Sequence, residues 1–468
     1  MEIVNMAEQL PEFSPAAAIL AEAARDLGLA DEWPERVRTS GAENLPSCFP
    51  VTDLAIASLA AAGLALADLL AAAGDTSAPV TVDRRLASAW FRYSLLPLGW
   101  SLPSPWDPIA GDYRAADGWI RLHTNARHHR DAALLVLKCA AEREAVAGVV
   151  ARWAGDALES AIVAVGGCAA RMRCRAEWRA HPQGQAVAGE RLIALTRAGG
   201  FAGSAWSPDP VRPLLGIRVL DLTRVLAGPV ATRFLAGLGA DVLRIDPPDW
   251  DEPGVVPDVT LGKRCARLDL RDGDVRRLLE RLLADADVLV HGYRPGALER
   301  LGLGEVARRV LNPGLIDVSL CAWGWSGPWS GRRGFDSLVQ MSSGIAEAGT
   351  SWKGADRPVP LPVQALDHAT GYFMAAASLR GLALRLREQT AISARLSLAR
   401  TAAALIGSGE EAVGPAFTDM SEADYALEIE RTPWGPARRL RSPLKIGDVR
   451  LRWDRPAAEL GSAQAQWI

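Results

Sequence analysis

The segment that decides the fold is GIRVLDLTRVLAGPVATRFLAGLGADVLRID, residues 216–246. It opens with a short apolar run, 216–220, that predicts a buried strand. Gly228-Pro229 then opens a helix, because proline suits the first helical turn, and Gly239 marks the end of that helix. Residues 241–245 predict a second strand. A strand, a helix and a strand in this order indicate parallel strands covered by helices.

The same alternation continues along the chain. Helices are predicted at 274–286 and 305–310, and strands at 288–291 and 315–320. We therefore expect an α/β protein with a Rossmann-like parallel sheet, and such sheets bind ligands at the loops that follow their strands. These loops are 223–229, 246–254, 292–296 and 321–334. An NAD site is not expected, because the first loop holds a single glycine instead of G-x-G-x-x-G.

The composition is that of an ordinary globular protein. The 468 residues are 49% hydrophobic and carry 52 basic against 55 acidic side chains, a net charge of −3, so no nucleic-acid or membrane partner is expected. Six scattered cysteines without a C-x-x-C pair argue against zinc and disulfides. The apolar run 54–67 is too short to span a bilayer, and the first residues do not resemble a signal peptide. We expect a cytoplasmic protein.

The N-terminal part predicts a different organisation. Helices are expected at 16–27, 50–74, 131–153 and 156–165, a short strand at 81–83, and a hairpin at 111–125. GSAWSPDPVRP, residues 203–213, predicts a linker between a region 1–202 and a region 214–468.

The chain has one histidine cluster, formed by His123, His128 and His129. No cysteine or carboxylate stands near it at a spacing usual for zinc. We therefore expect a polar, solvated strand end there, and no metal site.

A second informative stretch is LPVQALDHATGYFMAAA, residues 361–377, in which Asp367 stands where an Ala-rich helix should begin. A carboxylate at that place can accept N–H bonds as a helix N-cap. An earlier segment repeats this pattern: Asp53 aligns with Asp367 at an offset of 314 residues, and Asp83 aligns with Ser397 at the same offset. The repeat favours an internal duplication.

The half from 216 to about 404 resembles the class III CoA-transferases, which include formyl-CoA transferase and carnitine CoA-transferase. The resemblance is carried, in order, by the segment quoted first and by LGKRCARLDL (261–270), ADVLVHGYRPGALERLGLG (286–304), NPGLIDVSL (312–320), SGPWSGRRGFDSLVQMSSG (326–344) and ALDHATGYFMAAASLRGLALR (365–385). It implies a Rossmann-like domain joined to a small α+β domain, and a homodimer of interlocked chains.

The resemblance also implies the chemistry. Asp367, in a D-x-x-T-G setting, would attack an acyl-CoA thioester as a carboxylate that is ionised at neutral pH, and helix-start N–H groups would stabilise the oxyanions. CoA would be a substrate, with no tightly bound cofactor. By position, the implied CoA contacts are Val225, Leu226, Lys263, Gly292, Tyr293, Arg294, Arg300 and Arg333. Asp336 either contacts CoA or caps a helix.

Three readings remain open. Besides the transferase, the chain could be an acyl-CoA racemase of the same fold, although the histidine expected in a GHDINY-like segment is missing from GFDSLVQ (334–340), or an inactive CoA-binding protein. His368 would point away from Asp367, because adjacent helical residues do not share a face. Leu226 replaces a polar residue of formyl-CoA transferase and favours a less polar acyl group. The repeat and the resemblance together predict a chain that is duplicated and truncated or permuted, so residues 1–202 should complete the Asp367 pocket.

Overall fold

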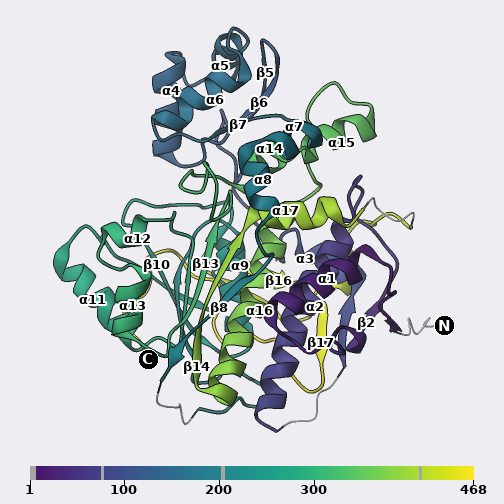
Figure 1. Cartoon of the computed structure of the whole chain (residues 1–468), viewed down its shortest axis with the longest axis vertical. Helices are drawn as coiled ribbons and strands as arrows, with labels where there is room; N and C mark the ends of the chain where they lie inside the picture. Colours follow the sequence, from purple (N-terminus) through teal and green to yellow (C-terminus); the bar gives the residue numbers. More distant parts are fainter. Residues whose placement is uncertain (1–6, 75–78, 202–205, 410–413) are drawn as a thin grey trace.

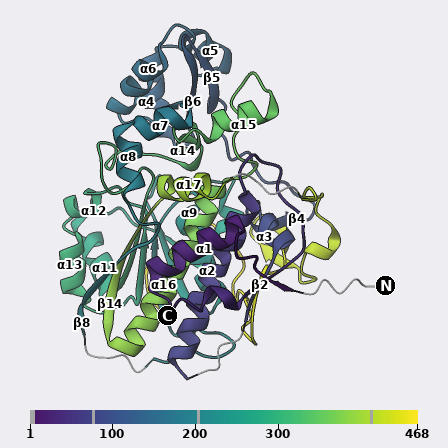
Figure 2. The ribbon, with the colours of Figure 1, turned by 45° about the vertical axis from the view of Figure 1, so that its right-hand side comes forward.

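The computed structural model describes residues 7–74, 79–201, 206–409 and 414–468. A large body contains the main sheet and the longest helices, and a small lobe lies at one end of it (Figures 1 and 2). Residues 203–205 of the predicted linker lie outside the described residues.

The body is built on a seven-stranded sheet of order β11-β10-β9-β12-β13-β14-β8. Its strands are β11 (Lys263–Arg267), β10 (Asp241–Asp246), β9 (Arg218–Leu222), β12 (Val288–His291), β13 (Ile316–Cys321), β14 (Thr390–Ser397) and β8 (Ala194–Gly200). All neighbours pair in parallel except β8, which is antiparallel to β14. The predicted parallel sheet is thus confirmed, with an added edge strand contributed by the N-terminal region.

Helices cover both faces of this sheet. Leu220 and Leu243 face an apolar cluster that includes α11 (Gly273–Ala284), while their neighbours Val219 and Val242 face a cluster that includes the long helices. This alternation follows from the two-residue period of a strand. The remaining helices on the sheet are α9 (Ala227–Gly237), α12 (Ala297–Arg300), α13 (Glu305–Leu311) and α16 (Ala365–Glu388).

Two long Ala-rich helices, α2 (Val51–Ala72) and α16, lie side by side in both views (Figures 1 and 2). Among the described residues, α2 is the one helix long and apolar enough to cross a membrane, yet almost all of it is buried inside the protein. It packs against α16 and α1 (Pro15–Leu27), which explains why its sequence is apolar on every side.

The two long helices have matching surroundings. Each is followed by a strand and a short helix: β3 (Val80–Asp83) and α3 (Arg84–Trp90) after α2, and β14 and α17 (Leu398–Gly407) after α16. The aligned Asp83 and Ser397 both cap these short helices, since their side chains accept from Leu86 N and Arg400 N. This likeness supports the predicted duplication, whose origin stays a prediction.

The small lobe is an α+β unit from the N-terminal region. Its sheet consists of β5 (Gly111–Ala115), β6 (Gly118–Leu122) and β7 (Ala169–Arg171), and its helices are α4 (Arg127–Leu137), α5 (Arg143–Val150) and α6 (Gly155–Ala164). The hairpin is where the sequence predicts it. The single helix predicted at 131–153 is wrong, because Lys138 adopts a left-handed conformation that ends α4.

The remaining elements join the two sequence regions. β17 (Leu444–Ile446) pairs with β3, and β16 (Gly435–Arg439) pairs with β4 (Leu95–Pro97). The other elements are β1 (Glu8–Gln9), β2 (Val37–Ser40), α7 (Arg175–Ala180), α8 (Pro182–Ala188), α10 (Val256–Val259), α14 (Asp336–Ser342), α15 (Ile345–Lys353) and β15 (Glu430–Thr432). Regions 1–202 and 214–468 therefore interleave in space.

Candidate active site

The N-terminus of α16 is capped by Asp336 and not by Asp367. One Asp336 oxygen accepts the backbone N–H groups of Leu366 (2.9 Å) and Asp367 (3.0 Å), and the other accepts from the Gln340 amide. Asp336 is fully buried and lines neither of the two cavities described below. Of the two roles predicted for Asp336, the structure supports the helix cap. Asp367 lies in the first turn of α16 and is not needed as its cap.

The first-turn N–H groups of α16 are also occupied. Besides the two that Asp336 accepts, Ala365 N donates to Val363 O and His368 N donates to Gln364 O. The expectation that these groups stabilise an oxyanion is therefore wrong for this conformation.

The Thr-Gly that follows Asp367 brings α16 against α9. A Cβ added at Gly371 would lie 2.4 Å from the carbonyl oxygen of Ala227, so only glycine permits this approach. The Thr370 hydroxyl bonds to the Thr401 hydroxyl at 2.7 Å and fixes the same turn. The motif thus places Asp367 beside the loop that starts α9.

That loop is held in a strained conformation. Val225 has φ +66°, in the left-handed region that β-branched residues rarely adopt, and its N–H donates to Glu252 at 2.9 Å. Strain of this kind persists only where the surroundings enforce it and is concentrated at functional sites. Val225 and Leu226 line the cavities beside Asp367, and their predicted contact with CoA stays a prediction.

Asp367 lies in an environment that disfavours its charge. The residue is 8% exposed, and in the described part of the chain no hydrogen bond or ion pair reaches its carboxyl group. Burial raises the pKa of Asp367 well above its usual range, and the neighbouring Asp336 carboxylate raises it further. The expectation of a carboxylate that is freely ionised at neutral pH is thus corrected for the unliganded site.

Asp367 stands between two cavities. One has a volume of about 570 Å³ and is called here the aromatic chamber; the other, of about 370 Å³, is called the basic cleft. Four residues line both: Val225, Trp250, Phe335 and Asp367. A group bound in the cleft can therefore extend past Asp367 into the chamber.

The basic cleft collects cations at the carboxyl edge of the sheet. It is lined by Arg224, Arg294, Arg332 and Arg333, and Asp367 is the one carboxylate in its lining. Arg224 stacks on Trp250 and Tyr293, at 5.1 and 5.3 Å from their ring centroids. The predicted residues in the cleft are Val225, Gly292, Tyr293, Arg294, Arg333 and Asp367.

Two predicted CoA contacts lie elsewhere. The Lys263 ammonium is buried, donates to Asp221 (3.0 Å) and Pro229 O (2.9 Å), and lines neither cavity. Arg300 is exposed on α12 and also lines neither cavity. Lys263 opens β11, a strand that the sequence did not predict, and Arg300 ends α12; side-chain direction was not predictable from position alone.

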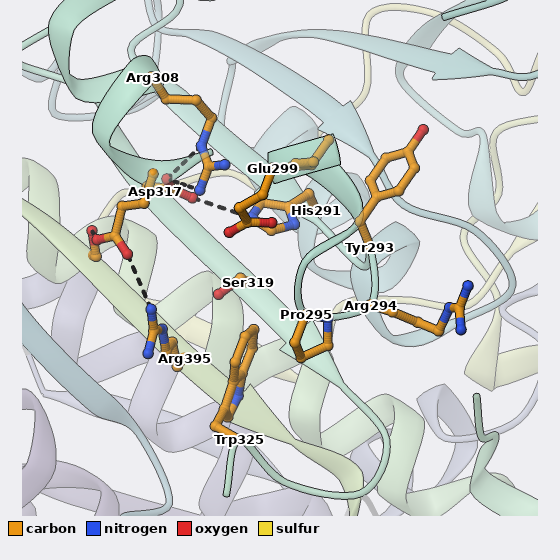
Figure 3. A pocket seen from close by; sticks show the side chains of 13 residues that line it. His291, Tyr293, Arg294, Pro295, Glu299, Arg308, Asp317, Ser319, Trp325 and Arg395 are labelled. Atoms are coloured by element: carbon orange, nitrogen blue, oxygen red, sulfur yellow. Dashed lines mark hydrogen bonds and ion pairs between the residues drawn. The ribbon is translucent and has the colours of Figure 1, made fainter. Parts of the chain in front are cut away.

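A third, much smaller cavity of about 40 Å³ lies beneath the loop 292–296 (Figure 3). Within it the Asp317 carboxylate accepts two bonds from Arg308, at 2.8 and 2.6 Å, and lies 3.4 Å from His291. This volume fits a few waters at most. The buried charge cluster is better suited to anchoring the end of β12, and with it the Tyr293-Arg294 loop, than to binding a ligand.

The N-terminal region completes the aromatic chamber. Its contribution consists of Phe91, Arg92, Tyr93, Ser104, Pro105, Trp106, Asp107, His123, Asn125 and Ala126. We predicted that residues 1–202 complete the Asp367 pocket, and residues of this region do line the same cavity as Asp367. These residues carry no motif, and only their fold around Asp367 identifies them.

The histidines differ from expectation. His123 and His129 are buried instead of solvated, and the His123 ring stacks on Phe335 with 3.7 Å between centroids. Burial lowers the pKa of both, that of His129 to about 3. His368, expected to point elsewhere, lines the aromatic chamber beside Asp367 and stacks on Phe91. The described residues contain no cluster suited to a metal.

Comparison with known proteins bears on this site. Residues 214–413 match CoA-transferase family III. The resemblance seen in the sequence is confirmed. An acetyl-coenzyme A transferase of Hypoxylon pulicicidum is 38% identical over 194 residues, 39% of this chain and 33% of that protein. Succinyl-CoA:glutarate CoA-transferase of Mus musculus is 35% identical over 219 residues, 42% of this chain and 50% of that protein.

Solved structures also match part of the chain. The crystal structure of Rv3272 from Mycobacterium tuberculosis has a TM-score of 0.39 at 32% identity, covering 42% of this chain and 59% of that one. The chain spans between a third and about half of the length of the two curated relatives. The family III match begins at residue 214 and thus leaves the N-terminal chamber wall outside it.

Proposed function

We propose that this chain is a CoA-transferase that moves CoA from an acyl-CoA thioester to a carboxylic acid, with Asp367 as nucleophile. The observation that carries the proposal is the position of Asp367 at the junction of the basic cleft and the aromatic chamber. Arginines in the cleft suit the phosphates of CoA, and the chamber suits an acyl group. The thioester would then lie next to the Asp367 carboxylate.

The proposed steps conserve the thioester energy in covalent intermediates. An Asp367 oxygen attacks the thioester carbonyl carbon, and the C–S bond breaks to give a mixed anhydride and CoA thiolate. The thiolate attacks the Asp367 acyl carbon, which forms an aspartyl-CoA thioester and releases the donor carboxylate. The acceptor carboxylate attacks the Asp367 acyl carbon of this thioester, and the C–S bond breaks to release CoA thiolate. The thiolate then attacks the acceptor carbonyl carbon of the new anhydride. Acyl-CoA leaves and the Asp367 carboxylate is restored.

Deprotonation of Asp367 precedes these steps. Because its pKa is raised in the unliganded site, the fraction of ionised Asp367, and with it the rate of attack, should increase with pH. The midpoint of the acid limb of the pH profile should therefore follow the ionisation of Asp367 beside Asp336.

A second function is favoured by one observation, the place of His123. A buried imidazole whose pKa is lowered and a carboxyl group whose pKa is raised line the same chamber, and α-proton exchange on an acyl-CoA requires such an acid/base pair. His123 stacks on Phe335, in the segment where the sequence lacked the expected histidine. The competing proposal is therefore an acyl-CoA racemase that uses His123 and Asp367.

One experiment separates the two functions. The protein is incubated with acyl-CoA thioesters and hydroxylamine, and the modified peptide is located by mass spectrometry. A hydroxamate at Asp367 that is absent from Asp367→Asn supports the transferase. The Asp53→Asn variant is the matched control, because Asp53 has the equivalent place on α2 but is paired with Arg84. No hydroxamate, together with deuterium uptake at the α carbon in D2O that His123→Ala abolishes, supports the racemase.

We also infer a cytoplasmic homodimer, as the family resemblance implies, in which the partners are small molecules. The molar mass from light scattering tests whether the protein is a dimer. The resistance of the dimer to dilution tests whether its chains interlock. A monomer at all concentrations would contradict the inference.

A further inference from the structure

We propose that the acyl group accepted by this protein is apolar and uncharged: the acyl group of an aromatic or branched monocarboxylic acid, and not of a dicarboxylic acid. This inference rests on the proposed function and names the substrate class of the same site. It is carried by the chemistry of the aromatic chamber.

The walls of the chamber are predominantly aromatic and aliphatic. Rings come from Phe91, Tyr93, Trp106, Trp250 and Phe335, and aliphatic surface from Leu226, Val255, Val259 and Val363. The two imidazoles in the lining, His123 and His368, are buried, and burial lowers the pKa of both so that they add no positive charge near neutrality. A cavity of about 570 Å³ with such walls binds an apolar ligand of moderate size.

The charges of the chamber oppose a second carboxylate. Besides Asp367, its lining holds four acids, Asp107, Asp251, Glu252 and Asp258, but a single arginine, Arg92. Arg92 is exposed and lies over the ring of Phe417, 5.4 Å from its centroid. Asp107, Glu252 and Asp258 are themselves paired with arginines, so a distal carboxylate would meet, among the described residues, one uncommitted cation at the rim and no other.

The arginines behind the wall are not available to a ligand either. Asp258 is paired with Arg233 (3.0 Å) and Arg439 (3.2 Å), and Glu252 with Arg244. Removing any of these cations from its partner would leave a buried carboxylate uncompensated, which is strongly unfavourable. Each is therefore committed to the fold.

The basic cleft and the aromatic chamber differ in charge, and this difference favours one orientation of a bound acyl-CoA. Among the described residues the cleft is lined by four arginines, of which Arg332 is paired with Glu159, and by no carboxylate except Asp367, whereas the chamber lining holds one arginine and more acids. An acyl-CoA consequently has one favourable orientation, with its phosphates in the cleft and an uncharged acyl group in the chamber.

The test uses phenylacetyl-CoA and isovaleryl-CoA against succinyl-CoA. For the purified full chain, dissociation constants are measured by titration calorimetry and Asp367 hydroxamate by mass spectrometry. We expect at least tenfold tighter binding and faster adduct formation with the apolar thioesters. Adduct formation that favours succinyl-CoA would overturn this inference and leave the transferase intact. Tighter binding of the apolar thioesters without any adduct would support the chamber and refute the transferase. Equal or undetectable binding of all three thioesters would overturn the inference.

A variant tests the wall itself. Trp106→Arg places a guanidinium in the chamber at a residue that is already 37% exposed, and should lower the preference for phenylacetyl-CoA over succinyl-CoA at least tenfold. Trp352→Arg makes the same exchange at an exposed tryptophan on α15 that lines neither cavity, and should leave the preference unchanged. Equal ratios in both variants would contradict the role of the chamber; should Trp106→Arg not fold, the comparison of the three thioesters on the unmodified chain decides.

Discussion

The Asp336→Asn variant isolates the charge that acts on Asp367. An asparagine oxygen can still accept the N–H groups of Leu366 and Asp367, so the cap of α16 is retained while the negative charge and the bond accepted from the Gln340 amide are removed. Burial still raises the pKa of Asp367, but the contribution of its neighbour is lost. We therefore expect Asp367 to ionise at lower pH in this variant.

The size of the shift follows from Coulomb's law. If neighbouring carboxylates are taken as unit charges about 6 Å apart at an effective dielectric constant of about 20, they repel by about 3 kcal/mol, which corresponds to about two pKa units. The sign is fixed, since removing a like charge favours the carboxylate. The helix N-terminus also loses a favourable anion, at a cost of about 0.3–1 kcal/mol in stability. The variant should thus fold, with a slightly lower melting temperature.

The assay is the rate of Asp367 hydroxamate formation with one acyl-CoA as a function of pH. The midpoint of the acid limb should move downward by one to about two units in Asp336→Asn. Asp53→Asn serves as the control, because it removes a first-turn carboxylate of α2 that lines neither cavity, and should not move the limb. An unmoved limb in a folded Asp336→Asn protein would refute the reasoning that Asp336 controls the ionisation of Asp367.

Three further predictions concern packing and charge. Gly371→Ala should destabilise the protein by about 1–3 kcal/mol and abolish the adduct, since its methyl group would displace α16 from Ala227; an unchanged thermal melt would contradict this. Lys263→Met leaves Asp221 buried without its cation and should cost about 3–5 kcal/mol in urea unfolding, whereas a purely CoA-binding lysine would change affinity alone. Arg294→Ala should weaken CoA binding roughly tenfold with a shallower salt dependence in calorimetry, and equal affinity would remove Arg294 from the site.

Most of the parallel sheet could be predicted because its strands are continuous apolar runs. The strand at 288–291 is found at the predicted residues, and the helices at 274–286 and 305–310 differ by one or two residues at their ends. Strand β11 was not predicted, because three of its five residues are charged and it lacks the apolar run of the other strands. β8 was not predicted for a different reason: it pairs with β14, which is far from it in the sequence, and only the three-dimensional fold brings the two strands together.

The site residues likewise fall into those that the sequence could predict and those that it could not. The loop 292–296 could be predicted because the carboxyl edge of a parallel sheet is a general ligand site, and the resemblance pointed to Tyr293 and Arg294 within it; both line the basic cleft. Arg224 and Arg332 lie in the predicted loops as well and could have been included on that ground. The chamber wall around Trp106 could not, since only long-range packing brings residues of the N-terminal region next to Asp367.

The two Ala-rich helices show how surroundings decide what an aspartate can do. Asp53 and Asp367 both lie in the first turn of a long buried helix, after residues of nearly equal backbone angles. Arg84 pairs with Asp53 at 3.1 Å and neutralises it, whereas Asp367 faces two cavities and a second carboxylate. An ion pair stabilises the charge of a carboxylate and makes it a poor nucleophile. A buried carboxylate without a partner is destabilised by its charge, so a reaction that removes this charge is favoured. Covalent capture of an acyl carbon removes the charge of Asp367, so the arrangement that raises its pKa also favours the proposed anhydride.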